Sequence, residues 1–148
     1  MEVGVKRITP QSAIDRYIQQ CLKVKELHVV NTLIDIGNRV VSEIRKRADY
    51  DNYTGNLRTS TRCGVVLRGK LIYTSPVKLE LPTALDGYRD SENLLHKIAD
   101  KYPFNSKNTL ALIVVAGMHY ASLVSANGRD VLDSGYILSK HLISRLLR

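Results

Sequence analysis

The feature that most constrains the fold is an apolar stripe of helical spacing near the N-terminus. Its members recur mostly at alternating intervals of three and four residues, the spacing of one face of an α-helix. Thr9 and Pro10 precede this stripe, and a hydroxyl followed by a proline is typical of a helix start. We expect one long amphipathic helix, or two in tandem, over about residues 10–48. The stripe comprises Ile14, Tyr17, Cys21, Val24, Leu27, Val30, Ile34, Gly37, Val41, Ile44 and Ala48.

Three successive intervals of three residues interrupt this pattern between Cys21 and Val30. Such a phase slip predicts that the helix is overwound, bent or broken near residues 27–31. Gly37 lies on the stripe, where a missing side chain lets another part of the backbone approach closely. A helix longer than the usual ~8–20 residues needs a surface to lie on. Either its own sheet covers the stripe within a monomer, or a neighbouring subunit does.

The period of the pattern changes to two after a polar loop at residues 49–56. In residues 57–67, apolar or β-branched side chains alternate with a second set that includes Arg58 and Arg62, and Arg68 follows. Gly69 and Lys70 then turn the chain into a second short strand, which predicts a β-hairpin. Cys63 falls on the apolar face, which favours a buried, unreactive thiol over a nucleophile.

Residues 75–109 are expected to form an excursion from the main fold. Residues 75–89 contain two prolines and no clean period, so they predict a loop with at most a short strand at residues 77–81. Asp90 or Ser91 then begins a short helix that ends before Pro103, and a polar loop follows.

The last part of the chain predicts two strands and a helix. Residues 110–116 are apolar throughout, which is typical of a central strand covered on both faces. After Gly117 a partner strand is expected to run through Ser125, and the last helix to begin near residues 130–134. This order predicts a single α+β domain over residues 1–148: the long N-terminal helix and the C-terminal helix pack on a mainly antiparallel sheet of about four strands.

Composition and the length of the apolar runs argue against a membrane-spanning, a secreted or a disulfide-stabilised protein. The 22 Lys and Arg against 14 Asp and Glu give a net charge of +8, which favours an anionic partner and is equally compatible with simple solubility. The longest apolar run is too short to cross a bilayer, and the N-terminus lacks the apolar region of a signal peptide. We therefore expect a protein made in the cytoplasm, with no membrane partner. Two cysteines do not make a disulfide framework.

A search for catalytic patterns finds none. No two of the four histidines are three or four residues apart, so no helical metal-ligand pair is present. The glycine-rich phosphate loop, the dinucleotide fingerprint and the nucleophile elbow are absent. Cys63 with His119 is the one pair that could make a thiol nucleophile, which leaves a cysteine-dependent enzyme as a third hypothesis. We expect no catalytic residue, no cofactor and no metal.

Nucleic-acid association is the alternative hypothesis. Arg58, Arg62 and Arg68 on one strand face, with Lys70 at the turn, would make a stripe that contacts phosphates. Aromatic side chains that would stack on bases are not interleaved with this stripe. The basic run at residues 45–47 is interpreted as a solvated helix end that complements the helix dipole. The alternative is therefore a small basic nucleic-acid-associated protein.

Two sequence blocks resemble a known family. Thr54-Gly55-Asn56-Leu57-Arg58-Thr59-Ser60 is similar to the T-G-x-L-R-x-S signature of tail-completion proteins, which join heads to tails in long-tailed bacteriophages. Residues 115–124, with Gly117, Tyr120 and Ala121, are similar to that family's later strand pair. Tyr102-Pro103 and residues 130–133 resemble the branch found in phages and prophages of gut Bacteroides-type bacteria. Many relatives have Glu-x-Gly-Thr where this chain has Ala126-Asn127-Gly128-Arg129.

The resemblance implies a non-enzymatic structural protein of the virion neck. Such proteins assemble as a homo-oligomeric ring, usually of six copies, between the head connector or adaptor and the tail terminator or tube proteins. Non-specific contact with passing DNA is compatible with that place. The residues expected at a subunit interface or at the lumen are Thr54, Gly55, Leu57, Arg58, Arg62, Arg68 and Tyr120.

Overall fold

The computed structural model describes residues 4, 8–79, 81–101 and 109–148, and these residues form five helices and a three-stranded antiparallel sheet. The predicted α+β class is confirmed, whereas the expected fourth strand is not found in these ranges. In chain order the elements are α1 (Gln11–Arg47), α2 (Asn56–Thr59), β1 (Thr61–Leu67), β2 (Lys70–Thr74), α3 (Leu85–Lys101), β3 (Leu110–Ala116), α4 (Ala121–Ala126) and α5 (Asp133–Leu146).

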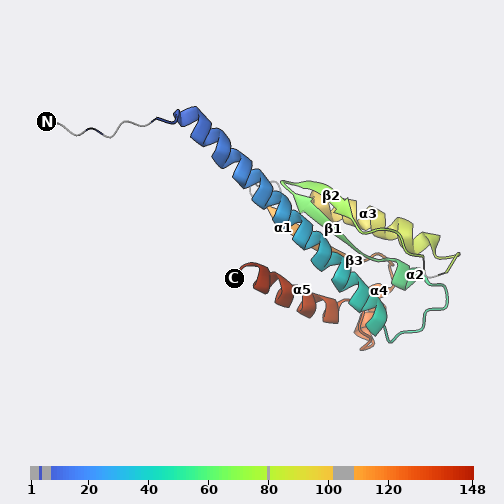
Figure 1. Cartoon of the computed structure of the whole chain (residues 1–148). Helices are drawn as coiled ribbons and strands as arrows, with labels where there is room; N and C mark the ends of the chain where they lie inside the picture. The colour runs from blue at the N-terminus through green and yellow to red at the C-terminus, as the bar shows by residue number, and fades with distance from the viewer. Residues whose placement is uncertain (1–3, 5–7, 80, 102–108) are drawn as a thin grey trace.

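The sheet has the strand order β2-β1-β3, and β1 pairs antiparallel with both neighbours. The predicted hairpin is confirmed: Leu67 pairs with Lys70 across a turn in which Gly69 has a φ of 80°. The expectation that residues 110–116 form the central strand was wrong, because β1 is central and β3 lies at an edge. The expected cover on both faces is confirmed: Leu112 and Val114 pack towards α1 and α5, and Ile113 and Val115 pack towards α3. Helices α1 and α5 lie over one face of the sheet, and α3 lies over the other (Figure 1).

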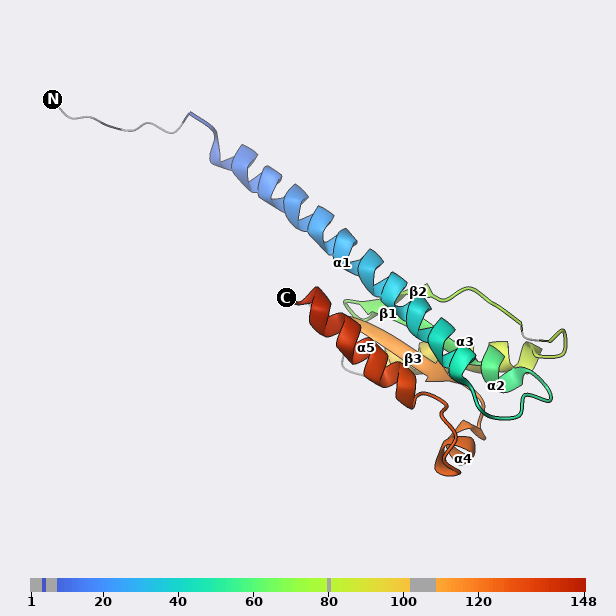
Figure 2. The same ribbon diagram turned by 60° about the horizontal axis from the view of Figure 1, so that its bottom comes forward.

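The long N-terminal element is one continuous helix, which passes through residues 27–31 without a break. Its buried residues begin at Val30 and continue to Ile44. The N-terminal half of α1 extends beyond the sheet and beyond the end of α5 in both views (Figures 1 and 2). The predicted break near residues 27–31 is therefore wrong. Contacts between α1 and the hairpin continue as far as Glu26, which pairs with Arg68.

Three apolar clusters hold the body together. The first packs α1 and α5 on the sheet and is centred on Val40 and Val65. The second packs α3 on the opposite face and is centred on Leu95 and Val66. The third closes the end of the fold where α1 finishes, and it consists of Tyr50, Leu57, Met118, Ala121 and Val131.

Glycines allow two of these contacts. A Cβ on Gly37 would lie 2.8 Å from Cys63 Sγ and 2.8 Å from Leu112 Cδ1, so the expected close approach is confirmed, with strand side chains as its partners. A Cβ on Gly117 would lie 2.5 Å from the backbone N of Ser91 in α3. Both glycines therefore set how closely a helix can approach the sheet.

The strand expected after Gly117 was wrong, because residues 121–126 form the helix α4. Met118 and Ala121 are buried, and Val124 packs beside them in the third cluster. Met118, Ala121 and Val124 are three residues apart, which matches the spacing of a helical turn. The segment was predicted as a strand because its polar and apolar residues also alternate.

The helix of the excursion begins earlier than predicted, at Leu85 rather than at residues 90–91. Its buried face repeats every four residues but starts with Gly87 and Ser91, which are small and not apolar, so hydropathy did not reveal it. No strand forms at residues 77–79, and residue 80 lies outside the described residues. The predicted helix end before Pro103 and the loop that follows it also lie outside them. Helix α5 begins where it was predicted.

Replacing Gly117 with alanine tests the contact between α3 and the end of β3. We expect the free energy of unfolding to fall by about 1–3 kcal/mol, because the new methyl group would meet backbone atoms that cannot move aside cheaply. Urea denaturation measures the change. Gly4→Ala is the control, since nothing lies within 4 Å of a Cβ at Gly4. Equal stability of the two variants would contradict the contact.

Candidate assembly interface

The N-terminal half of α1, residues 11–29, is called the arm. Five of its large apolar side chains are exposed to solvent, and Tyr17 and Val24 each retain 68% of their accessible surface. The other three are Ile18, Leu22 and Leu27. Removing the exposed parts of these five side chains from water would be worth about 5–9 kcal/mol. An isolated helix is only marginally stable in water, so such an arm gains from a surface to pack on.

Most of the exposed apolar residues of the arm point away from the side on which the body lies. Leu27 is the exception, because it lines a hollow together with Leu67 and Ile72 of the hairpin. Cys21 is exposed and Val30 is buried, and at about 3.6 residues per turn the nine residues between them make roughly two and a half turns. The two side chains therefore lie on opposite sides of the helix. The side of the arm in line with the buried face carries polar residues instead, such as Asp15, Gln19 and Lys23. A sheet extended along the same side of α1 would not cover the apolar face of the arm.

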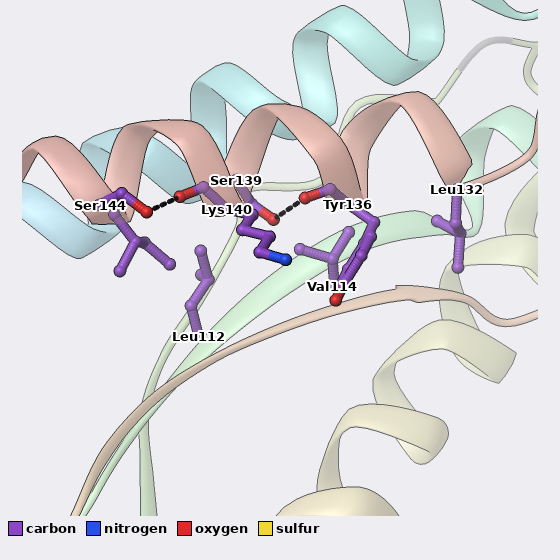
Figure 3. Close-up of a pocket in the computed structure, with 8 residues that line it drawn as sticks. Leu112, Val114, Leu132, Tyr136, Ser139, Lys140 and Ser144 are labelled. Atoms are coloured by element: carbon purple, nitrogen blue, oxygen red, sulfur yellow. Dashed lines mark hydrogen bonds between the residues drawn. The ribbon is translucent and has the colours of Figure 1, made fainter.

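A groove lies between α5 and the edge strand β3 (Figure 3). Its volume is about 540 Å³. Figure 3 shows Leu112 and Val114 of β3 on one side of the gap and Tyr136 of α5 on the other. The hydroxyls of Ser139 and Ser144 donate to backbone carbonyls of their own helix, at 2.8 Å and 2.7 Å. The wall is therefore mainly apolar, and its residues are Leu112, Val114, Leu132, Tyr136, Ser139, Lys140, Ile143 and Ser144.

The two sequence blocks that carry the family resemblance, residues 54–60 and 115–124, meet at one end of the fold. The Gly117 N–H donates to the Ser60 carbonyl at 3.2 Å. Leu57 of the first block packs with Met118 and Ala121 of the second. Gly55 has a φ of 71°, a conformation that favours glycine, and it directs the chain into the single turn of α2.

A shallow hollow of about 340 Å³ opens beside this contact. Three of the predicted interface residues, Thr54, Leu57 and Tyr120, line it together, although Leu57 is only 4% exposed and belongs to the third apolar cluster. Tyr53 lines it as well and is 86% exposed, although it was not among the predicted interface residues. Asn56 is held in place because its side-chain oxygen accepts a hydrogen bond of 3.1 Å from the Gly87 N–H.

The predicted arginine stripe is wrong, because the three arginines do not share an exposed strand face. Arg62 is only 2% exposed: it forms an ion pair with Glu92 and donates to the carbonyl of Ser75. Its guanidinium also lies 5.0 Å from the centroid of the Tyr88 ring. Arg68 lies at the hairpin turn and pairs with Glu26 of the arm.

Arg58 is out of line with Arg62 because α2 replaces the first three residues of the expected strand, residues 57–59. Its guanidinium donates to the carbonyl of Ala48 at 3.1 Å. Arg45 in turn donates to the carbonyls of Arg58 and Thr61, at 3.1 Å and 3.0 Å. The basic run at residues 45–47 is therefore only partly a solvated helix end, since Arg45 joins the end of α1 to α2.

Cys63 has no exposed surface, and burial raises the pKa of its thiol to about 11. The thiol packs against Gly37, whereas His119 is exposed in the turn before α4. A raised thiol pKa disfavours the thiolate that a nucleophilic mechanism requires. In the described ranges, no three His, Cys, Asp or Glu side chains are grouped so as to hold a metal ion. Within the same ranges, no helix combines the length and apolar character needed to span a membrane.

Comparison of this chain with protein-family models, curated proteins and solved structures found no match. The arm, the α5–β3 groove and the hollow beside α2 are therefore interpreted from their own chemistry. All three are surfaces suited to protein contact, and the first two are mainly apolar.

Replacing Arg62 with methionine tests whether this arginine is structural. We expect the free energy of unfolding to fall by about 2–4 kcal/mol, because Glu92 and the Ser75 carbonyl would lose their buried partner. Arg68→Met is the matched control, and its exposed ion pair should be worth no more than about 1 kcal/mol. Urea denaturation compares the two variants, and a cost at Arg62 as small as that at Arg68 would contradict the buried role.

The two cysteines should react differently with a thiol reagent at pH 7. We expect Cys21, which is exposed, to react at least about 100-fold faster than Cys63, whose thiolate is scarce and inaccessible. Mass spectrometry of timed samples measures both rates. Because the folded pKa of Cys63 lies above its ordinary value of 9.0, its contribution to stability is present below pH 9 and is lost as the pH rises towards 11. Fast labelling of Cys63 in the folded protein would contradict this assignment.

Proposed function

We propose that this protein is a non-enzymatic structural subunit that assembles as a ring at the neck of a long-tailed bacteriophage, between the head connector and the tail. The observation that carries the proposal is the exposed apolar face of the arm, which points away from the chain's own sheet. A subunit whose principal helix is only half covered by its own fold is suited to a role in which neighbours complete the burial.

The difference between the two uncovered surfaces supports head-to-tail assembly, which is compatible with a ring. The arm and the α5–β3 groove are unlike one another and belong to different parts of the chain. Contact between unlike surfaces is head-to-tail, and it generates a closed ring when the rotation between subunits closes. This is the architecture that the resemblance to tail-completion proteins implies.

The two blocks that carry the resemblance add a second line of support. They are separated in the sequence, yet Ser60 and Gly117 are hydrogen-bonded and Leu57 packs on Met118. The hollow beside them gathers Thr54, Leu57 and Tyr120 at one end of the body. We propose this end as a contact surface for a neighbouring neck or tail protein.

The nucleic-acid alternative loses the feature on which it was based, since Arg62 is buried and Arg58 and Arg68 lie in different settings. The net charge of +8 remains available for non-specific contact with DNA that passes through a ring. Such contact is an accompanying property in this proposal rather than the function.

The proposed place in the virion is tested in phage particles that carry a tagged copy of this chain. We expect the tag at the junction of head and tail in electron micrographs, and we expect deletion of the gene to leave separate filled heads and tails. A tag found elsewhere, or normally joined particles after deletion, would overturn the neck assignment.

The arm variant Tyr17→Glu/Val24→Glu tests the role of the exposed face. We expect it to fold as the natural chain does, because both side chains are exposed, and to lower the yield of joined particles at least tenfold. The matched control is Asn93→Glu/Lys97→Gln, which makes the same change of charge at two exposed positions of α3. Joining that is impaired equally by both variants would show a general charge effect rather than a role for the arm.

A further inference from the structure

Two apolar surfaces remain uncovered in the part of the chain that the structure describes. The arm is a projecting helix whose exposed apolar residues lie mostly on the side away from the body. The α5–β3 groove is lined by residues of α5 and by Leu112 and Val114 of β3. Helices commonly dock in apolar grooves through residues spaced by three and four, as Ile14, Tyr17, Ile18 and Cys21 are here.

We propose that the arm of one copy lies in the α5–β3 groove of a second copy. The lengths agree: at about 1.5 Å per residue, the apolar part of the arm from residue 14 to residue 27 extends roughly 20 Å. On the same measure the groove wall on α5, from Leu132 to Ser144, extends roughly 18 Å. The inference rests on the self-association that the proposed function requires, and it names the two surfaces that meet.

The arm does not reach its own groove. The C-terminal half of α1 packs against α5, through Ile36, Val40 and Ile44 against the apolar side chains of α5. Because α1 is one continuous helix, the arm continues past the end of α5 and away from it (Figures 1 and 2). Only another molecule can therefore place an arm in this groove.

Pairing of two arms with each other is the competing arrangement. It would cover Tyr17 and Val24 but would leave Tyr136, which is 68% exposed, and the rest of the groove uncovered. Contact between arm and groove covers both surfaces at once. It also repeats from copy to copy, whereas an arm–arm pair closes after two copies.

Disulfide cross-linking distinguishes these arrangements, because Cys21 lies exposed on the apolar side of the arm and Cys63 is buried. The variants Ser139→Cys and Ser144→Cys each place a second thiol at one point along the groove. Mild oxidation of the folded, concentrated protein should give a ladder of dimers, trimers and larger species with at least one of them. Peptide mapping should find Cys21 joined to the new cysteine. The controls are the same variants with Cys21→Ser and a Lys97→Cys variant on α3, neither of which should give a ladder.

Mixing two defective variants gives an independent readout. Tyr17→Glu/Val24→Glu retains the groove, and Tyr136→Glu retains the arm, so each should stay monomeric alone and the mixture should form one-to-one dimers by light scattering. Efficient Cys21–Cys21 dimers of the natural chain, without a ladder in the groove variants, would overturn the inference in favour of paired arms. So would the absence of any cross-link or mixed dimer at high concentration. Neither result would contradict the proposed place of the chain in the neck. Conversely, a chain that forms ladders but is missing from virions would overturn only the proposed function.

Discussion

The contact between the C-terminal half of α1 and the central strand β1 is the interaction on which the rest of the structure depends. Gly37 lets the helix approach Cys63 and Leu112, and Val40 and Ile44 then pack on Val65. This contact fixes one half of a long, continuous helix to the body. Because an α-helix is stiff over this length, the other half is held away from the body, where its apolar residues remain in water.

The same contact organises the far end of the fold. The last turns of α1 bring Arg45 to the carbonyls of α2, and α2 in turn presents Leu57 and Ser60 to the segment that follows β3. Arg45 and Arg58 join secondary-structure elements through backbone carbonyls. Arg62 is buried with Glu92 and the Ser75 carbonyl, so these three arginines serve the fold.

Strong periodicity in the sequence predicted the elements that have it. The long helix, the hairpin after residue 60 and the last helix follow from apolar spacing, whereas the break predicted near Leu27 was wrong because α1 is continuous there. The start of α3 was not predicted because its buried face begins with glycine and serine. Helix α2 was not predicted because a single helical turn is too short to show a period. The groove could not be predicted, since it depends on how far α5 stands from β3.

Part of the candidate site was predicted from the family resemblance rather than from periodicity. Thr54, Leu57 and Tyr120 belong to the two sequence blocks that carry the resemblance, and the fold brings them together at one hollow. The prediction of an arginine stripe was wrong because it assumed that the alternation continues through residues 57–59, where the backbone is helical. An uncovered stripe can be suspected from sequence, but which residues remain exposed depends on where the sheet ends.

The mass of the folded protein as a function of its concentration, with and without its tail partner, tests the central claim most directly. If the arm's apolar face is covered by another copy, sedimentation should show discrete species above 16.6 kDa that grow with concentration or with the partner present. The chain with Tyr17→Glu/Val24→Glu should remain at the mass of one copy. A natural chain that stays a single copy under every one of these conditions, with Cys21 open to solvent throughout, would contradict the account.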